Sequence, residues 1–73
     1  MEKVTIHTDF IRLDALLKYT ALVSSGGEAK MAIADGLVSV NGEVCTKRGK
    51  KLTVGDQISF CGEELKIIND EDS

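Results

Sequence analysis

Residues 36–42 read G-L-V-S-V-N-G and mark the point where helical spacing gives way to the alternation of a strand. The first glycine follows Asp35, at a place where a helix commonly ends in the left-handed conformation that glycine adopts without strain. Val38 and Val40 alternate with polar residues, which is typical of a half-buried strand. The closing Asn-Gly pair is the strongest two-residue signal for a tight hairpin turn. The stretch therefore predicts a helix that ends near Asp35, followed by a strand and a hairpin.

The residues before this stretch predict two helices. In residues 8–19 the apolar positions recur at helical spacing, and either Thr8 or Asp9 can cap the start. A second helix is predicted to begin at Ser25, because Ser25 and Glu28 have the spacing of a capping box, in which each side chain accepts a backbone N–H at the helix start. Its apolar face consists of Ala29, Ala32 and Ile33.

The residues after the stretch alternate as short strands separated by turn signals. A returning strand is predicted over residues 44–46. Residues 52–56 are predicted to form a short strand that closes in a turn, and residues 57–60 another strand. After a turn at residues 62–64, a last strand is predicted over residues 65–68.

Two helices followed by four or five short strands indicate an α+β fold, in which the two helices pack on one side of a small antiparallel sheet. A chain of 73 residues has room for one domain. We expect this domain over residues 1–69, with an acidic C-terminal tail at residues 70–73.

The basic side chains are concentrated in one short segment. The net charge is −3, but three of the twelve acidic residues lie in the tail, which leaves nine acids and nine bases in the rest of the chain. Four of the nine bases are Lys47, Arg48, Lys50 and Lys51. Such a run is often no more than a solvated loop, but it also supplies the positive charge that binds nucleic acid.

The start of the second predicted helix is a second candidate anion site. Gly26 and Gly27 lie in its first turn, and Lys30 follows four and three residues later, so all three project on one solvent-facing side. Free N–H groups and the positive end of the helix dipole attract an anion there, and the lack of side chains lets a phosphate approach the backbone. Alternatively, the glycines only permit a tight loop and Lys30 only aids solubility.

If the helix start and the basic loop share one face, they present about five cations to a nucleic-acid backbone, which would bind through counterion release. Neither segment contains an aromatic residue. We therefore expect recognition of shape and phosphate rather than stacking on unpaired bases.

The sequence contains no recognisable catalytic or metal-binding constellation. His7 is the only histidine, and Cys45 and Cys61 are sixteen residues apart without a second Cys/His pair, which argues against zinc. Neither cysteine has an identifiable base partner. We therefore expect no enzyme activity, no cofactor, no metal and no small-molecule substrate.

The expected location is the cytoplasm, without a membrane partner. The first ten residues contain no apolar run of the length that a secretory signal requires, and no later segment is long and apolar enough to span a bilayer. Both cysteines are accordingly expected to be reduced thiols.

Four motifs in this order resemble the S-four RNA-binding domain, named after a protein of the small ribosomal subunit. They are R-L-D-A-L-L at residues 12–17, S-G-G-E-A-K at residues 25–30, I-A-D-G-L-V-S-V-N-G at residues 33–42 and G-D at residues 55–56. The chain is most similar to free-standing bacterial members of this family, of the YaaA or YbcJ type, which consist of little besides this module.

The resemblance implies the αL motif, with structured RNA bound along the second helix and the adjoining loops. The RNA-facing positions it implies are Arg12, Ser25, Lys30 and the loop at residues 47–51. Where many members carry an arginine after the serine, this chain has Gly26. The implied partners are ribosomal or transfer RNA and ribosomal particles, in ribosome assembly or translation, without the catalytic domain that often accompanies the module.

A hypothesis of a different class is a protein-interaction adaptor. In it, the exposed edge of the predicted hairpin would pair with a strand of a partner. The acidic tail and the net negative charge favour this alternative.

Overall fold

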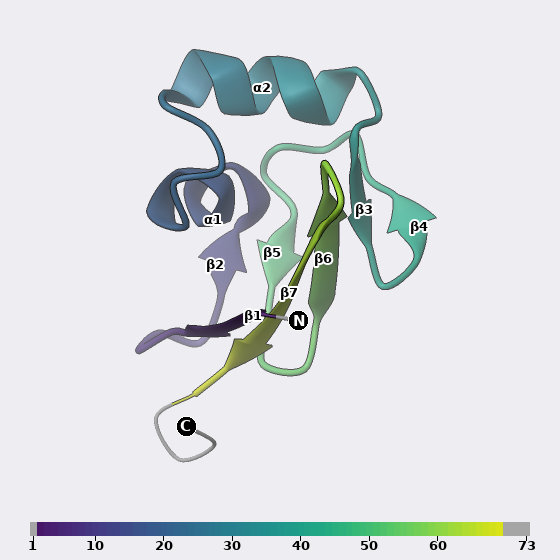
Figure 1. Ribbon diagram of the computed structural model, residues 1–73. Coiled ribbons are helices and arrows are strands. Elements are labelled where there is room, and N and C mark those ends of the chain that lie inside the picture. Colours follow the sequence, from purple (N-terminus) through teal and green to yellow (C-terminus); the bar gives the residue numbers. More distant parts are fainter. Residues whose placement is uncertain (1, 70–73) are drawn as a thin grey trace.

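The computed structural model describes residues 2–69, so the acidic tail predicted at residues 70–73 lies outside the described residues. In chain order, the elements are β1 (Glu2–Thr5), β2 (Ile11–Arg12), α1 (Leu13–Tyr19), α2 (Gly26–Ala34), β3 (Val38–Val40), β4 (Glu43–Val44), β5 (Lys51–Leu52), β6 (Gln57–Phe60) and β7 (Glu63–Ile68) (Figure 1).

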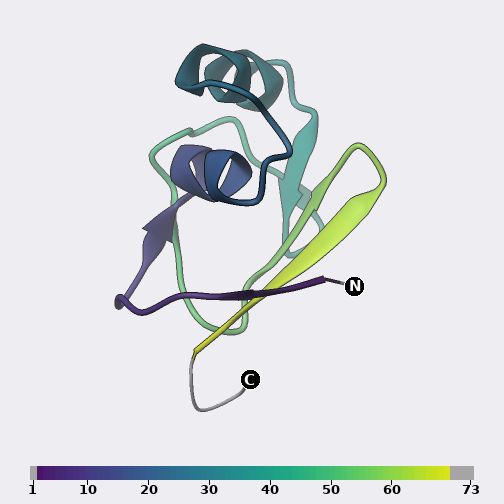
Figure 2. The same cartoon turned by 60° about the vertical axis from the view of Figure 1, so that its left-hand side comes forward.

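The strands form a five-stranded sheet and a separate two-stranded ladder. The order in the large sheet is β1-β7-β6-β3-β4, and β1 pairs with β7 in parallel while the other neighbours are antiparallel. The ladder joins β2 to β5, antiparallel, and β2 leads directly into α1. Both helices lie on one side of the large sheet (Figure 2). The predicted α+β class is confirmed, with one parallel pair that the sequence did not indicate.

One apolar cluster joins both helices to both sets of strands. The fully buried side chains in it include Leu13, Leu16 and Leu17 of α1, Ile33 of α2, Val38 of β3, Leu52 of β5, Ile58 of β6, and Leu65 and Ile67 of β7. Because Leu52 is among them, the short strand that follows the basic run is fixed to the core.

The second helix and the hairpin turn match the prediction closely. The helix α2 has Ser25 as its N-cap and Asp35 as its C-cap, and Gly36 has a left-handed φ of 77°. At the turn between β3 and β4, Asn41 and Gly42 have φ values of 53° and 86°. Two successive left-handed residues define the turn that the Asn-Gly pair predicts.

The first helix is shorter than predicted. It begins at Leu13 instead of residue 8, and Arg12 is its N-cap without a side-chain hydrogen bond. Thr8 does not cap it, since its hydroxyl donates to the carbonyl oxygen of Phe10 at 2.7 Å within a turn. Phe10 is 40% exposed and so is not part of the buried stripe that suggested the longer helix.

Several strand boundaries also differ from the prediction. The segment Glu2–Thr5 forms the unpredicted strand β1. The short strand predicted at the start of residues 52–56 is Lys51–Leu52, and the predicted turn follows it at residues 54–55. The returning strand ends at Val44. The last strand begins at Glu63, because the turn before it is formed by Cys61 and Gly62, with φ values of 52° and 83°.

Candidate nucleic-acid interface

The start of α2 is capped by side chains in a modified capping box. The hydroxyl of Ser25 accepts from the N–H of Glu28 at 3.2 Å, as predicted. The Glu28 carboxylate accepts from the N–H of Ser24 at 3.1 Å, not from that of the N-cap residue itself. Gly26 and Gly27 are exposed, and as the first residues of a helix their amides have no partner within it. Lys30 is exposed one turn further on.

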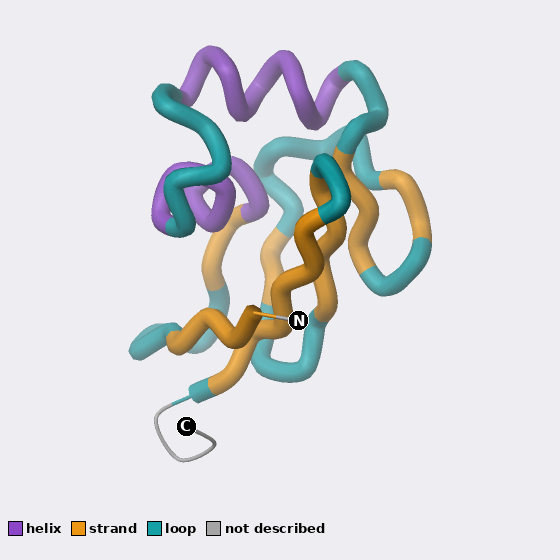
Figure 3. Tube along the Cα trace, in the orientation of Figure 1, coloured by secondary structure: helices purple, strands orange, loops and turns teal. Residues whose placement is uncertain are grey.

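The basic loop, residues 45–50, connects β4 to β5 (Figure 3). It runs between two different sheets, since β4 belongs to the large sheet and β5 to the small ladder. All four basic side chains of the run are exposed, namely those of Lys47, Arg48, Lys50 and Lys51.

The backbone of this loop closes the N-terminal end of α1. The N–H of Leu13 donates to the carbonyl oxygen of Lys50 at 2.9 Å, and the N–H of Asp14 donates to that of Arg48 at 3.1 Å. These bonds satisfy amides that a helix start leaves without intrahelical partners. The loop is therefore fixed against α1 through its carbonyl groups, while its side chains remain free for a ligand.

Arg12 lies at the junction between the loop and α1. It is directly opposite Lys51 in the ladder of β2 and β5. Its guanidinium Nη2 is 3.2 Å from Asp14 Oδ2, and a Cβ placed on Gly49 would lie 3.8 Å from the same nitrogen. The side chain is still 54% exposed. Arg12, which the family resemblance implies as an RNA-facing residue, thus lies beside the basic side chains of the loop.

One face of α1 connects the basic loop with the start of α2. Asp14 and Lys18 are four residues apart and so lie on the same face, about 6 Å from each other along the axis. Asp14 contacts the loop through its amide, whereas the ammonium of Lys18 is 4.0 Å from where a Cβ on Gly26 would stand. Figure 2 shows the loop and the start of α2 on the same side of the molecule as α1.

We call this surface the cationic face. The name covers the exposed basic side chains of the loop, the small ladder and the two helices, together with the start of α2 at Ser25, Gly26 and Gly27. The basic side chains are Arg12, Lys18, Lys30, Lys47, Arg48, Lys50 and Lys51. The sequence analysis missed Lys18. Its position one turn after Asp14 was visible in the sequence, but its proximity to Gly26 depends on how the two helices pack.

An aromatic ring that the basic segments themselves lack lies beside Lys51. The ammonium of Lys51 lies 4.8 Å from the centroid of the Phe10 ring. The two basic segments contain no aromatic residue, but the surface they form does include one. The pairing of β2 with β5 brings residue 10 next to residue 51.

The Asn and Asp residues of the quoted motifs have structural contacts. The side chain of Asn41 donates to Asp56 Oδ1 at 3.1 Å and accepts from the N–H of Gln57 at 2.9 Å. Asp56 also accepts from the N–H of Thr53 at 2.9 Å. These bonds join the turn after β3 to the turn before β6. The Asn-Gly and Gly-Asp motifs therefore stabilise the fold and do not contribute ligand contacts.

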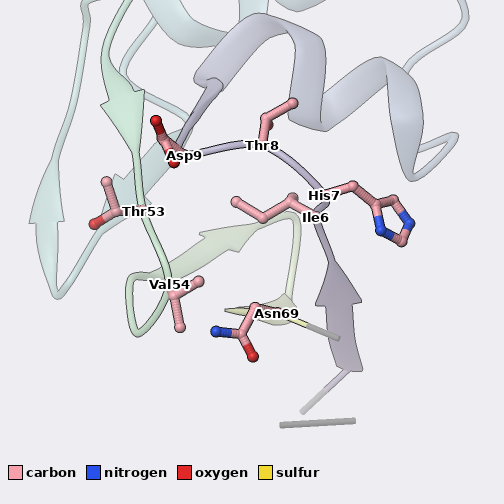
Figure 4. A pocket seen from close by; sticks show the side chains of 7 residues that line it. All are labelled: Ile6, His7, Thr8, Asp9, Thr53, Val54 and Asn69. Atoms are coloured by element: carbon pink, nitrogen blue, oxygen red, sulfur yellow. The ribbon is translucent and has the colours of Figure 1, made fainter. Parts of the chain in front are cut away.

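A hollow of about 480 Å³ lies near the end of the described chain, lined by Ile6, His7, Thr8, Asp9, Thr53, Val54 and Asn69 (Figure 4). None of these residues is a lysine or arginine, and the His7 ring points away from the centre of the group in Figure 4. The hollow therefore does not extend the cationic face.

Other chemical features of the described residues are few. Within residues 2–69, no three His, Cys, Asp or Glu side chains are arranged to hold a metal ion. Both cysteines are free thiols, and Cys61 is exposed in the turn between β6 and β7. No helix in the described part of the chain has the length and apolar character needed to cross a membrane. The edge strand β4, on which the adaptor hypothesis depends, has only two residues.

Comparison with known proteins agrees with this geometry. Residues 4–68 match the S4 domain. The chain is 39% identical over 67 residues to the "Probable ribosome maturation protein RlbA" of Bacillus subtilis strain 168, which covers 90% of this chain and 94% of the relative. It is 38% identical over 58 residues to the "Putative RNA-binding protein YbcJ" of Escherichia coli strain K12, covering 80% of this chain and 83% of the relative.

The solution structure of YbcJ from Escherichia coli superposes on the fold with a TM-score of 0.64 and 34% sequence identity. The match covers 92% of this chain and 84% of the YbcJ chain, whose αL motif is described as involved in RNA binding. The family resemblance read from the four motifs is confirmed: the chain belongs to the S4 domain family.

Proposed function

We propose that this chain is a non-catalytic RNA-binding protein that holds structured RNA by its phosphates on the cationic face. The observation that carries the proposal is the position of α1 between two cation sources. Its first amides bind the carbonyl groups of the basic loop, and Lys18, further along the same helix, reaches the start of α2. One RNA backbone can therefore contact both at once.

The charge distribution supports a polyanionic ligand despite the net charge of −3. Seven of the nine basic side chains belong to the cationic face. The other two, Lys3 and Lys66, are partners on β1 and β7 and alternate with buried residues that face the helices. They consequently point from the opposite side of the sheet, where they cannot reach the same ligand.

Two carboxylates beside the cationic face, those of Asp14 and Glu28, have partners of their own. Asp14 pairs with Arg12 and also accepts from the N–H of Ala15 at 2.8 Å. Glu28 accepts from the backbone before α2. Each carboxylate thus fixes backbone next to the cations. Within residues 2–69, six of the seven cations have no carboxylate within salt-bridge distance, and the seventh, Arg12, pairs with Asp14.

The proposed ligand is ribosomal or transfer RNA, and the proposed process is ribosome assembly or translation in the cytoplasm. The names of the two relatives, a ribosome maturation protein and an RNA-binding protein, support this choice. A face of exposed lysines and helix amides suits the phosphate backbone of a folded RNA, which is recognised largely through shape.

The direct test is binding of purified protein to fluorescent ribosomal RNA fragments and transfer RNA at several salt concentrations. We expect log K to fall linearly with log salt, with a slope of about −3 to −4 for four or so phosphates. Absent binding, or binding that does not change with salt, would contradict the proposal.

A matched pair of variants locates the binding surface. Arg48→Glu with Lys50→Glu reverses two charges of the loop, whose contacts to α1 are made by carbonyl groups and so are kept. Lys3→Glu with Lys66→Glu changes the net charge equally on the far side of the sheet. We expect the loop variant to lose most of its affinity and the control to keep it. The adaptor hypothesis would be favoured by a different result: the wild-type protein retains no RNA, and the loop variant still pulls down a protein partner.

A further inference from the structure

Phe10 is an exposed aromatic ring on the border of the cationic face. Its side chain is 40% exposed, while the ammonium of Lys51 stands 4.8 Å from the ring centroid. An aromatic ring in this position does little for the core, because Ile11 and Leu52 supply the apolar contacts of the same ladder.

The register of the ladder places Phe10 on the same side as two cations. Arg12 and Lys51 are directly opposite each other, so their side chains share one face. Ile11 is opposite Leu52, which is fully buried, so that pair faces the core. Phe10 is two residues before Arg12 and, by the alternation of an extended chain, projects outward with the cations.

We propose that Phe10 is a stacking platform for one unpaired base of the RNA whose backbone is bound by the cationic face. The inference rests on the proposed function and narrows its ligand: a structured RNA with an unpaired nucleotide that bulges from a paired stem beside the bound phosphates. A base has a π-face that fits an aromatic ring, and exposed rings beside a basic groove are how proteins hold unpaired nucleotides.

Lys51 suits this arrangement because its ammonium can contact either the Phe10 ring or an RNA phosphate. Without RNA it rests on the negative face of the Phe10 ring. When a base takes that place, the flexible side chain is free to move to the adjoining phosphate. The base then covers the Phe10 ring in place of the ammonium, and the positive charge of Lys51 lies next to the phosphate of the bound nucleotide.

The test compares two RNA hairpins that have the same loop and differ only in the stem, which is fully paired in one and carries a single bulged nucleotide in the other. Wild-type protein should prefer the bulged hairpin. Phe10→Leu keeps an apolar side chain but removes the π-face, and it should weaken binding to the bulged hairpin by about fivefold to 150-fold, the range that corresponds to loss of one stacked base. Binding of the fully paired hairpin should not change.

Phe10→Trp provides an independent measurement, because the chain contains no tryptophan. This variant should keep the preference for the bulged hairpin, and its fluorescence should change on addition of that RNA but not of the paired one. Tyr19→Leu is the control: it removes another exposed ring at the opposite end of α1 from the loop, and should leave the preference intact.

Two results would overturn the inference separately from the proposed function. If wild-type protein binds both hairpins equally, or if Phe10→Leu keeps the preference, the ring is not a stacking platform although RNA binding stands. If wild-type protein binds neither hairpin nor the longer RNA fragments, the proposed function fails and the inference fails with it.

Discussion

The backbone amide of Leu13 donates to the carbonyl oxygen of Lys50 at 2.9 Å, so the first amide of α1 is bound by the basic loop and not by the side chain of its N-cap residue, Arg12. This bond has two effects. It completes the start of α1, and it fixes the loop with its lysine and arginine side chains directed to solvent. Stability of the helix and presentation of the cations therefore depend on the same contact.

The hydroxyl of Ser25 should stabilise the start of α2. Replacing Ser25 by Ala removes the bond to the N–H of Glu28, and we expect the free energy of unfolding to fall by about 1 kcal/mol. Urea denaturation followed by circular dichroism measures the change. Ser24→Ala is the control, since Ser24 contributes only its backbone N–H to the cap. An equal effect of both variants would show that the cap bond is not responsible.

The side chain of Asn41 should stabilise the fold through its two hydrogen bonds. Asn41→Gly keeps the left-handed conformation but removes the bonds to Asp56 and Gln57, and should lower the free energy of unfolding by about 1 to 3 kcal/mol. Cys61→Gly is a matched control at the other left-handed hairpin position. At that position, glycine relieves the strain of the left-handed backbone but raises the conformational entropy of the unfolded chain. Because the two effects oppose each other, the free energy of unfolding should change by no more than about 1 kcal/mol. Similar losses from both variants would refute the role given to Asn41.

Lys18 should contribute to RNA binding although no motif indicates it. We expect Lys18→Glu to weaken binding of every RNA tested and to make the slope of log K against log salt shallower by about 1, as for loss of one phosphate contact. Fluorescence anisotropy at four or more salt concentrations provides both values. Lys3→Glu, an equal charge change on β1, should alter neither. An unchanged slope for Lys18→Glu would remove this residue from the cationic face.

The sequence predicts best those features that depend on neighbouring residues. The capping pair at Ser25 and Glu28, the end of the helix at Gly36 and the Asn-Gly turn all have local causes, and each was found at or within one residue of the expected place. The helical apolar face of α2 was likewise correct.

Features that depend on distant residues could not be predicted in this way. The start of α1 is set by carbonyl groups about 35 residues later in the chain, so the apolar spacing alone extended the helix too far. The strands β2 and β5 have two residues each and exist because they pair with each other. The approach of Lys18 to Gly26 and of Phe10 to Lys51 follows from these long-range contacts.

The central claim is that the basic loop and the start of α2 bind one RNA backbone together. The most direct measurement is titration of the ¹⁵N-labelled protein with a ribosomal RNA hairpin, followed by amide chemical shifts. We predict shifts that develop in parallel at Lys18, at Gly26 and Gly27, and at residues 47–51, with little change at Lys3 and Lys66. Shifts centred on β1 and β7, or confined to only one of the two elements, would contradict the account.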